Sequence, residues 1–375
     1  PDARSNGSRT FSTPSAMLDC ATSDNDSSSA RWQPLVTCVY NTSINSPHAE
    51  VAGSKFRSTM TPAADILFGC YLILVELLAI VFNGFVIGIS IWKRKSLKAS
   101  DTYVVCLAAS DLGHPLTSYP MIIASSFRHS WIFGEAGCQW NGFTGFFFGV
   151  NSMMTLAVMS LSRLLVITNS NFARSHARSI TLTLMLSSVA FSLFWAVCPI
   201  LGWGEYGPEP YRTSCTLIWD EPDKSFVTAS FVGCLAIPAA IMCYSYFRIL
   251  CIALRTRHRR LQWAPRSQEI KIWEKKELRL LKMTLLMCST FMLCWTPYAV
   301  VAMIKSYAGQ LHLPPAATAL PALAAKTSHV IDPLIYCGMN RNFSRHLTTL
   351  WRHRSNVDLE QTTQTMPLKN LITDV

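Results

Sequence analysis

A single lysine stands in the middle of an apolar segment near the C-terminal end of the 375-residue chain. It is Lys326, in the run 316–339, and two alanines, Ala324 and Ala325, precede it. A buried lysine either pairs with a carboxylate or is held as the neutral amine, and a neutral amine attacks carbonyl carbon. If this segment lies in a membrane, Lys326 is the first residue to which a function should be assigned.

Other polar side chains also fall inside apolar stretches. A charged group at the centre of a membrane helix costs about 2.5–3.5 kcal/mol, so such groups usually face the helix bundle and mark function. Three of them, Asn83, Asp111 and Asp332, also have a structural interpretation as a polar network that packs helices together. The full set is Glu76, Asn83, Asp111, His114, Lys326 and Asp332.

The elements that must position these residues are apolar runs long enough to cross a bilayer, which takes roughly 20 residues. Hydrophobic residues make up 50% of the chain and charged ones 15%, and the apolar residues are concentrated in seven runs. The last run is the weakest, because it contains two prolines, Lys326, His329 and Asp332. The predicted spans are Ile66–Trp92, Tyr103–Phe127, Trp140–Thr168, Ile180–Leu201, Phe226–Leu254, Leu280–Ile304 and Ala316–Met339.

Basic residues set the orientation of these spans. They gather in the segments 93–98, 174–178 and 255–282, which follow the first, third and fifth runs and therefore lie on one side. The positive-inside rule makes that side cytoplasmic, with the N-terminus outside the plasma membrane. These basic segments account for the net charge of +11, and they would face anionic lipid and an acidic protein partner. The charge is therefore explained without a nucleic-acid ligand.

The predicted fold class is an all-α membrane protein, a bundle of seven transmembrane helices with a short amphipathic eighth helix. Residues 1–64 are rich in polar residues and are predicted to be an extracellular disordered tail, with glycosylation sequons at Asn6, Asn25 and Asn41. Residues 65–339 form the membrane domain, 340–354 the amphipathic helix and 355–375 the cytoplasmic tail. No metal site is predicted.

Several motifs, taken in order, resemble a rhodopsin-type G-protein-coupled receptor across residues 65–350. Each is weak alone, but their order and spacing together are specific. They are Asn83, the run ending at Asp111, Cys138, Arg163, Pro238, Tyr246, the Cys294–Pro297 run and the Asp332–Tyr336 run.

Within that class, Lys326 lies six residues before Asp332, which is where opsins carry the lysine that binds retinal. The segments 202–217 and 131–134 look most like the neuropsin group of non-visual opsins. The resemblance implies a light-sensing receptor, not an enzyme, with 11-cis- or all-trans-retinal bound to Lys326 as a Schiff base.

A protonated Schiff base needs a counterion, and the resemblance offers two positions for it. One is Asn141, which cannot be charged, and the other is Glu209, which is therefore the candidate. Glu209 also has a simpler interpretation as a solvated loop carboxylate between two prolines. Glu76 is a further alternative for the counterion.

The resemblance also implies a disulfide between Cys138 and Cys215, and a retinal pocket formed by aromatic residues. An aromatic cluster at helical spacing is more often ordinary packing, and only the presence of Lys326 favours a pocket. Trp219 is a weaker pocket candidate. The main candidates are Phe291, Trp295, Tyr298 and Gly149.

Signalling to a heterotrimeric G protein is expected at the cytoplasmic face. Serine at position 162 stands where the family usually has an acid, so Arg163 is expected to rely on Glu277, and some activity in the dark follows. Because position 141 carries no acid, a bistable pigment is expected. Receptor kinase and arrestin are further expected partners. The residues assigned to the switch are Arg163, Glu277, Tyr246, Asp332 and Tyr336.

Two other functions remain open. Beside the light-sensing receptor, one alternative is a retinal photoisomerase that signals weakly. The other is a receptor for a diffusible ligand in which Lys326 pairs with Glu76 or Asp332. His114, one helical turn beyond Asp111, has no assigned role: it is either a core histidine or a group that tunes proton affinity near the pocket.

Overall fold

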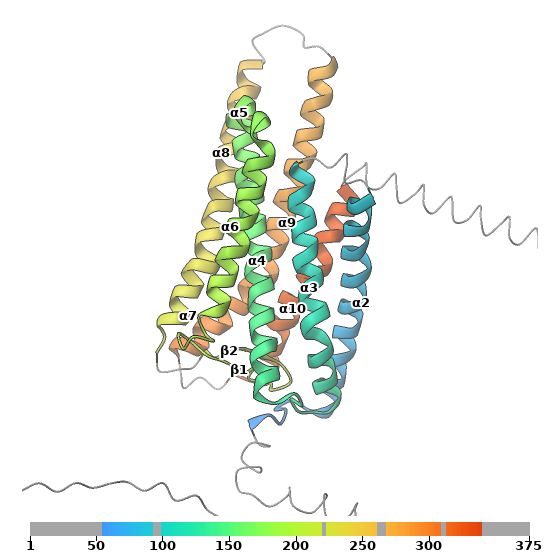
Figure 1. Cartoon of the computed structure of the whole chain (residues 1–375), viewed down its shortest axis with the longest axis vertical. Helices are drawn as coiled ribbons and strands as arrows, with labels where there is room; N and C mark the ends of the chain where they lie inside the picture. Colours follow the sequence, from blue (N-terminus) through green and yellow to red (C-terminus); the bar gives the residue numbers. More distant parts are fainter. Residues whose placement is uncertain (1–54, 93–98, 220–222, 261–267, 309–312, 340–375) are drawn as a thin grey trace, which may run out of the picture. The chain divides into compact units, whose positions relative to one another are not determined.

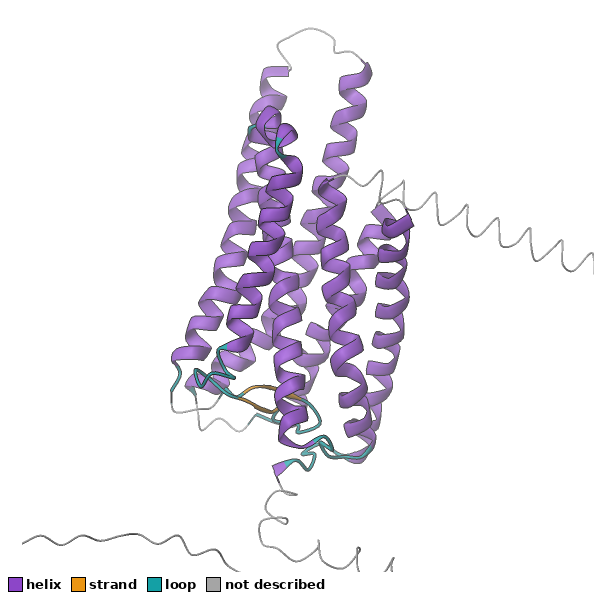
Figure 2. Cartoon of the chain, in the orientation of Figure 1, coloured by secondary structure: helices purple, strands orange, loops and turns teal. Residues whose placement is uncertain are grey.

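The computed structural model describes residues 55–92, 99–219, 223–260, 268–308 and 313–339. Within these ranges the chain is a bundle of long helices with one small β-hairpin (Figures 1 and 2). Residues 1–54 of the predicted tail 1–64, the predicted amphipathic helix 340–354 and the predicted cytoplasmic tail 355–375 lie outside the described residues.

The predicted runs all form helices. The elements are α2 (Pro62–Trp92), α3 (Ala99–Phe127), α4 (Gly134–Thr168), α5 (Ser170–Ser175), α6 (Ala177–Val197), β1 (Tyr206–Pro208), β2 (Cys215–Leu217), α7 (Ser225–Ser230), the π-helical segment η2 (Phe231–Ala236), α8 (Ile237–Arg260), α9 (Gln268–Tyr307) and α10 (Pro315–Met339). Because α7, η2 and α8 follow one another without a break, they form one continuous span.

Five spans in the described part of the chain are long and apolar enough to cross a membrane by length and composition alone: α2, α4, α6, α7 to α8, and α9. The helices α3 and α10 fall short because each contains buried polar residues and two prolines. Both nevertheless pack in the bundle against helices that are long and apolar enough: α3 against α2 and α4, and α10 against α2 and α9. The predicted fold class, a multi-pass seven-helix membrane protein, is therefore confirmed.

Helix α4 occupies the centre of the bundle. It contacts α3, α6, α8 and α9, while α10 packs between α9 and α2 (Figure 1). Its residues Leu156 and Met159 are fully buried, whereas large apolar side chains such as Leu67 on α2 and Leu293 on α9 are about 70% and 74% exposed. Polar side chains such as Asn83 and Asp111 are fully buried, and large apolar side chains on the outside are typical of a lipid-facing bundle.

The hairpin was not predicted from the sequence. Strands β1 and β2 are antiparallel, with Pro208 opposite Cys215, and they lie at the end of the bundle where α4 begins (Figure 1). The turn between them is closed by a bond from the Glu209 amide to the Ser214 carbonyl, 2.8 Å, and Arg212 adopts a positive φ of 63°. At this end of the bundle both strands of the hairpin lie against α4.

The π-helical segment η2 widens the helix one turn before Pro238. Proline has no amide hydrogen, so the carbonyl four residues earlier, that of Cys234, loses its usual helical partner. The wider turn places Phe231 and Cys234 along the cavity described next.

Candidate functional site

Lys326 lies on the inner face of α10 and is only 9% exposed. Its backbone carbonyl accepts a hydrogen bond from Tyr119 of α3, 3.2 Å, which ties the lysine to the neighbouring helix. Among the described residues no salt bridge joins Lys326 to Glu76 or Asp332. The carboxylate whose charge acts on Lys326 is Glu209.

Glu209 is buried in the hairpin turn, with 2% of its surface exposed. The interpretation of Glu209 as a solvated loop carboxylate is therefore wrong. Tyr298 donates its hydroxyl hydrogen to Glu209 Oε1 over 3.0 Å, whereas the buried Oε2 has no hydrogen-bond partner in the described part of the chain. Burial raises the pKa of Glu209 to about 7, although the charge of Lys326 and the Tyr298 hydrogen bond both lower it. A carboxylate with this pKa changes charge near neutral pH.

The hairpin is held against α4 by covalent and polar links. The predicted disulfide between Cys138 and Cys215 is confirmed. Beside it, Asn141 Oδ1 accepts the Cys215 amide hydrogen over 3.1 Å, and Asn141 Nδ2 donates to the Ser118 carbonyl, 3.2 Å. A neutral amide suits this position because it must donate and accept at once. These links fix the depth at which Glu209 enters the bundle.

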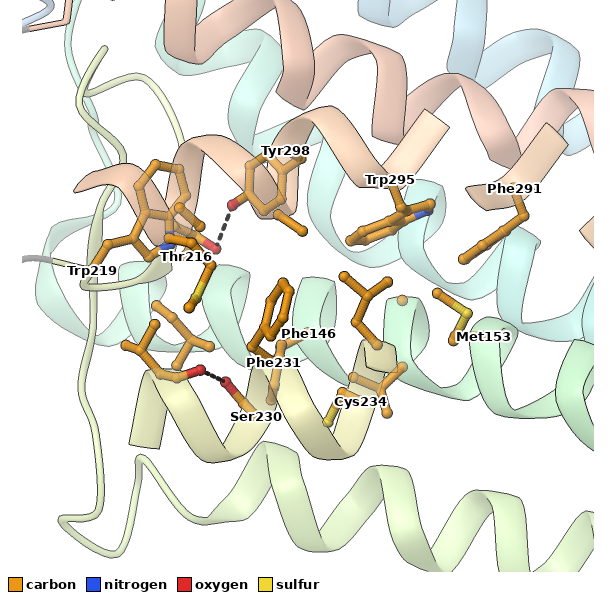
Figure 3. A pocket seen from close by; sticks show the side chains of 18 residues that line it. Phe146, Met153, Thr216, Trp219, Ser230, Phe231, Cys234, Phe291, Trp295 and Tyr298 are labelled. Atoms are coloured by element: carbon orange, nitrogen blue, oxygen red, sulfur yellow. Dashed lines mark hydrogen bonds between the residues drawn. The ribbon is translucent and has the colours of Figure 1, made fainter. Parts of the chain in front are cut away.

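An apolar cavity lies between α4, the hairpin, η2 and α9 (Figure 3). Four predicted pocket residues, Phe291, Trp295, Tyr298 and Gly149, line it, and so does the weaker candidate Trp219. The cavity thus combines aromatic residues that lie far apart in the sequence.

The aromatic rings of this cavity support one another. Phe291 and Trp295 stack with their centroids 5.6 Å apart, and Trp219 meets Tyr298 edge to face at 5.2 Å. A side chain on Gly149 would place its Cβ 2.6 Å from the Trp295 ring, so only glycine leaves room for that ring. Such packing fixes the shape of the cavity.

Lys326 and Glu209 are not among the residues that line this cavity. Two residues that line the cavity, Tyr298 and Trp295, connect Glu209 and the Lys326 segment to it. Tyr298 binds Glu209, and Trp295 Nε1 donates to Ser328 Oγ, 3.2 Å, two residues after the lysine. A buried amine and a buried carboxylate therefore adjoin an apolar cavity, an arrangement suited to an elongated apolar carbonyl compound.

The candidate polar core residues Asn83 and Asp111 both contact His329, to which no role was assigned from the sequence. Asn83 Nδ2 donates to the His329 carbonyl, 2.8 Å, and Asp111 Oδ1 lies 3.1 Å from His329 Nδ1 and accepts from Ser152, 2.8 Å. The signal that would have found His329 is its spacing of three residues from Lys326, which places both on one helix face. Asp332 is also buried, and its charge and that of Asp111 act on each other.

The candidate switch residues lie toward the other end of the bundle. Arg163 is 7% exposed near the end of α4, Tyr336 is buried in the core, and the Tyr246 hydroxyl lies 3.6 Å from Cys288 Sγ. The side chain of Glu277 lies outside the described residues, so the structure does not bear on its expected pairing with Arg163. Ser162 Oγ donates to the Met159 carbonyl, 3.0 Å, within its own helix.

Comparison with known proteins gives consistent matches. Residues 82–336 match the family model of the 7 transmembrane receptor (rhodopsin family). Opsin-5 of Homo sapiens is 31% identical over 303 residues, which cover 80% of this chain and 85% of that protein. The visual pigment-like receptor peropsin of Homo sapiens is 30% identical over 323 residues, covering 85% of this chain and 91% of its own. The crystal structure of squid rhodopsin superposes with a TM-score of 0.73 at 27% identity, covering 82% of this chain and 84% of that one.

Proposed function

Because the chain belongs to the opsins, within the rhodopsin family of seven-transmembrane receptors, we propose that it senses light through retinal held covalently on Lys326. The predicted likeness to the neuropsin group is confirmed by the match to Opsin-5, a neuropsin. The proposal concerns the chromophore, its attachment and the signal that follows.

The observation that carries the proposal is the relation between Lys326 and Glu209. The two ionisable groups come from α10 and the hairpin, are nearly fully buried, and act on each other electrostatically. Glu209 Oε2 has no hydrogen-bond partner among the described residues, which leaves it available to a cation. Burying an unpaired charge is expensive, so a site that buries groups of both signs is suited to a protonated Schiff base at the lysine nitrogen.

The residues of the site fit retinal. The cavity wall is apolar and aromatic, as a polyene requires, and the ring of Trp295 lies against the open face of Gly149. When bound, retinal would supply an aldehyde that condenses with the lysine amine with loss of water, and a polyene that isomerises in light.

Each residue then has a defined task. Lys326 supplies the attachment nitrogen, Glu209 balances its positive charge, and Tyr298 holds Glu209 by its hydrogen bond. Phe291 and Trp295 orient the ligand and exclude water by stacking. The burial of both groups increases the effect of Glu209 on the lysine nitrogen, because charges interact more strongly where water is absent.

Signalling is proposed to pass through a heterotrimeric G protein at the end of the bundle that carries Arg163. In this proposal the chain lies in the plasma membrane with its N-terminus outside, and receptor kinase and arrestin end the signal. Ser162 cannot form an ion pair with its neighbour Arg163, which favours measurable G-protein activity in the dark. With Asn141 engaged in structural hydrogen bonds, Glu209 remains the counterion, and we propose that the pigment is bistable.

The test of the chromophore is an absorption spectrum of the purified chain with 11-cis- or all-trans-retinal, before and after illumination. A light-sensitive band that acid traps as a covalent adduct is expected, and it should vanish in Lys326→Ala. The matched control is Lys305→Ala, which removes a lysine from the last turn of α9 and should keep the band. Folded wild-type protein with no band from either isomer would refute the proposal.

Nucleotide exchange on a purified G protein separates a receptor from a retinal photoisomerase. A receptor raises exchange on illumination and retains its chromophore. Isomerised retinal that accumulates without any change in exchange would favour the photoisomerase. Nucleotide exchange that responds to an added diffusible ligand but not to retinal would favour a receptor for a diffusible ligand.

A further inference from the structure

Two histidines and an aspartate form a continuous chain of polar contacts inside the bundle, and the proposed function leaves them unused. His329 Nδ1 lies 3.1 Å from Asp111 Oδ1, and His329 Nε2 lies 2.9 Å from His114 Nδ1. His114 is 5% exposed, and the other two side chains are completely buried. Helical spacing builds this chain, since His114 follows Asp111 by three residues on α3 and His329 follows Lys326 by three on α10.

The contacts allow two arrangements of the hydrogens, and the protonation of Asp111 decides between them. An ionised Asp111 only accepts, so His329 donates from Nδ1 and accepts at Nε2, and His114 then donates from Nδ1. The lone pair of His114 Nε2 is left at the free end of the chain. If Asp111 is protonated instead, every hydrogen moves to the other side of its bond, and His114 carries its hydrogen at Nε2. Both arrangements keep both hydrogen bonds.

The free end of the chain, His114 Nε2, lies close to α4. A Cβ on Gly145 would lie 3.2 Å from His114 Nε2, closer than an ordinary contact, so glycine leaves room for the imidazole at this point. The charges of Lys326 and His114 act on each other, so the lysine nitrogen lies within electrostatic range of the same imidazole. Tyr119 connects the two residues, because its ring lies 5.0 Å from that of His114 and its hydroxyl donates to the Lys326 carbonyl, 3.2 Å.

We propose that His114, His329 and Asp111 form a proton wire that removes the proton from Lys326 Nζ. The proton on Nζ passes to His114 Nε2, the hydrogen on His114 Nδ1 passes to His329 Nε2, and the hydrogen on His329 Nδ1 passes to Asp111. One N–H bond is lost at Lys326 and one O–H bond is gained at Asp111, and both histidines end neutral. The inference rests on the proposed function, because it concerns the lysine that would hold retinal.

The wire converts two buried charges into two neutral groups. A proton left on a single buried imidazole would remain an unpaired cation, whereas transfer to Asp111 cancels a positive and a negative charge together. Asp332 favours this outcome, because two buried carboxylates whose charges act on each other are not both ionised at low cost. The proton arrives at Asp111 Oδ1, the oxygen that His329 Nδ1 contacts at 3.1 Å, and from there Asp111 donates back to Nδ1.

Other groups near the wire must be considered in any pH experiment. Tyr119 of α3 meets the ring of His114 edge to face at 5.0 Å, and its hydroxyl binds the Lys326 carbonyl. Glu76 of α2 acts on Tyr119, Glu209 of the hairpin acts on Lys326, and Ser152 of α4 donates to Asp111. The titratable and charged groups facing the wire are Lys326, Asp332, Tyr119, Glu76 and Glu209.

The first test needs no retinal. Nitrogen NMR of ¹⁵N-histidine-labelled full-length protein in lipid nanodiscs should show two neutral imidazoles with hydrogen on Nδ1 at alkaline pH. Both should change together to the Nε2–H form as the pH falls, and Asp111→Asn should abolish this joint change. Replacements His114→Gln and His329→Gln assign the two signals. If His114 and His329 carry their hydrogens on different ring nitrogens, or if their signals change independently with pH, the wire is refuted.

The second test follows the lysine nitrogen directly. The rate at which all-trans-retinal forms a borohydride-trapped adduct on Lys326 is measured against pH. The wire should keep this rate high at neutral pH, and His114→Gln should slow it roughly tenfold or more there, with the difference shrinking at alkaline pH, where hydroxide can take the proton. His329→Gln, which interrupts the wire in the middle, should have the same effect. His176→Gln, which removes an exposed histidine, is the matched control.

The outcomes separate the two proposals. If wild-type protein forms the adduct and His114→Gln and His329→Gln match it at every pH, the wire is refuted and the proposed function stands. If wild-type protein forms no adduct, the proposed function fails, and the NMR experiment alone decides whether the histidines move protons together.

Discussion

Tyr298 donates a hydrogen bond to Glu209 Oε1 over 3.0 Å, and this one contact joins the aromatic cavity to the buried carboxylate. The same hydroxyl lies 2.9 Å from Thr216 Oγ1 of strand β2 (Figure 3), so α9 and the hairpin meet at this point. A change in the position of α9 would therefore alter the charge balance around Lys326.

Tyr298→Phe should raise the pKa of Glu209 above its value of about 7, because the hydroxyl stabilises the ionised carboxylate. A hydrogen bond to a charged group is worth about 1.5–3 kcal/mol, so the pKa should rise by roughly one unit or more. Infrared spectroscopy of the carboxylic acid band, assigned by its loss in Glu209→Gln, measures the change. Tyr307→Phe is the control, since Tyr307 binds Thr228 and no carboxylate. An unchanged midpoint in Tyr298→Phe would show that the contact does not control Glu209.

Glu209→Gln should remove a pH dependence of stability from protein to which no retinal has been added. The folded-state pKa of about 7 exceeds the ordinary value of 4.5, so the folded protein binds the proton more tightly than the unfolded chain. Stability should therefore fall as the pH rises from 4.5 through about 7, by roughly 3 kcal/mol in total, and the amide should abolish that fall. Thermal unfolding in lipid nanodiscs across this pH range measures it. Glu205→Gln, at an exposed position in the same loop, should keep the wild-type profile.

Gly149→Ala should disturb the cavity, because the new Cβ would lie 2.6 Å from the Trp295 ring. The ring must move, which typically costs 1–3 kcal/mol in a packed core. The expected result is a lower unfolding temperature and a changed tryptophan fluorescence spectrum. Gly84→Ala is the matched control, since a Cβ there meets nothing within 4 Å. Equal unfolding temperatures for the two variants would mean that Trp295 shifts without cost.

Cys215→Ser should release the hairpin from α4. The Cys138–Cys215 disulfide joins residues 77 apart, and closing a loop of that size restricts the unfolded chain by roughly 4 kcal/mol. Loss of stability should be accompanied by faster hydrogen exchange at the amide of Glu209, which bonds to Ser214 in the turn. Cys70→Ser, at an exposed free cysteine, should change neither quantity. Unchanged exchange at Glu209 would show that Asn141 alone holds the hairpin in place.

The sequence by itself determined the helices and the residues that needed explanation. Apolar runs of bilayer length specify helices because backbone groups in lipid must bond within their own segment. The cost of a charge at membrane depth singled out Lys326 without any knowledge of its neighbours. The last helix, α10, is diluted by proline and polar residues, and it was predicted only because its segment resembles the one that carries the retinal-binding lysine in opsins.

The tertiary structure decided which residues meet. Glu209 sits in a Pro-Glu-Pro turn whose sequence suits a solvated loop equally well, and only the hairpin, tied to α4, buries it. His329 and His114 are 215 residues apart, and no local pattern indicates that their nitrogens lie 2.9 Å from each other. Helix periodicity gives the face on which a residue lies but not the rotation or depth of the helix opposite. Packing between helices fixes both, and with them the charge partners of Lys326.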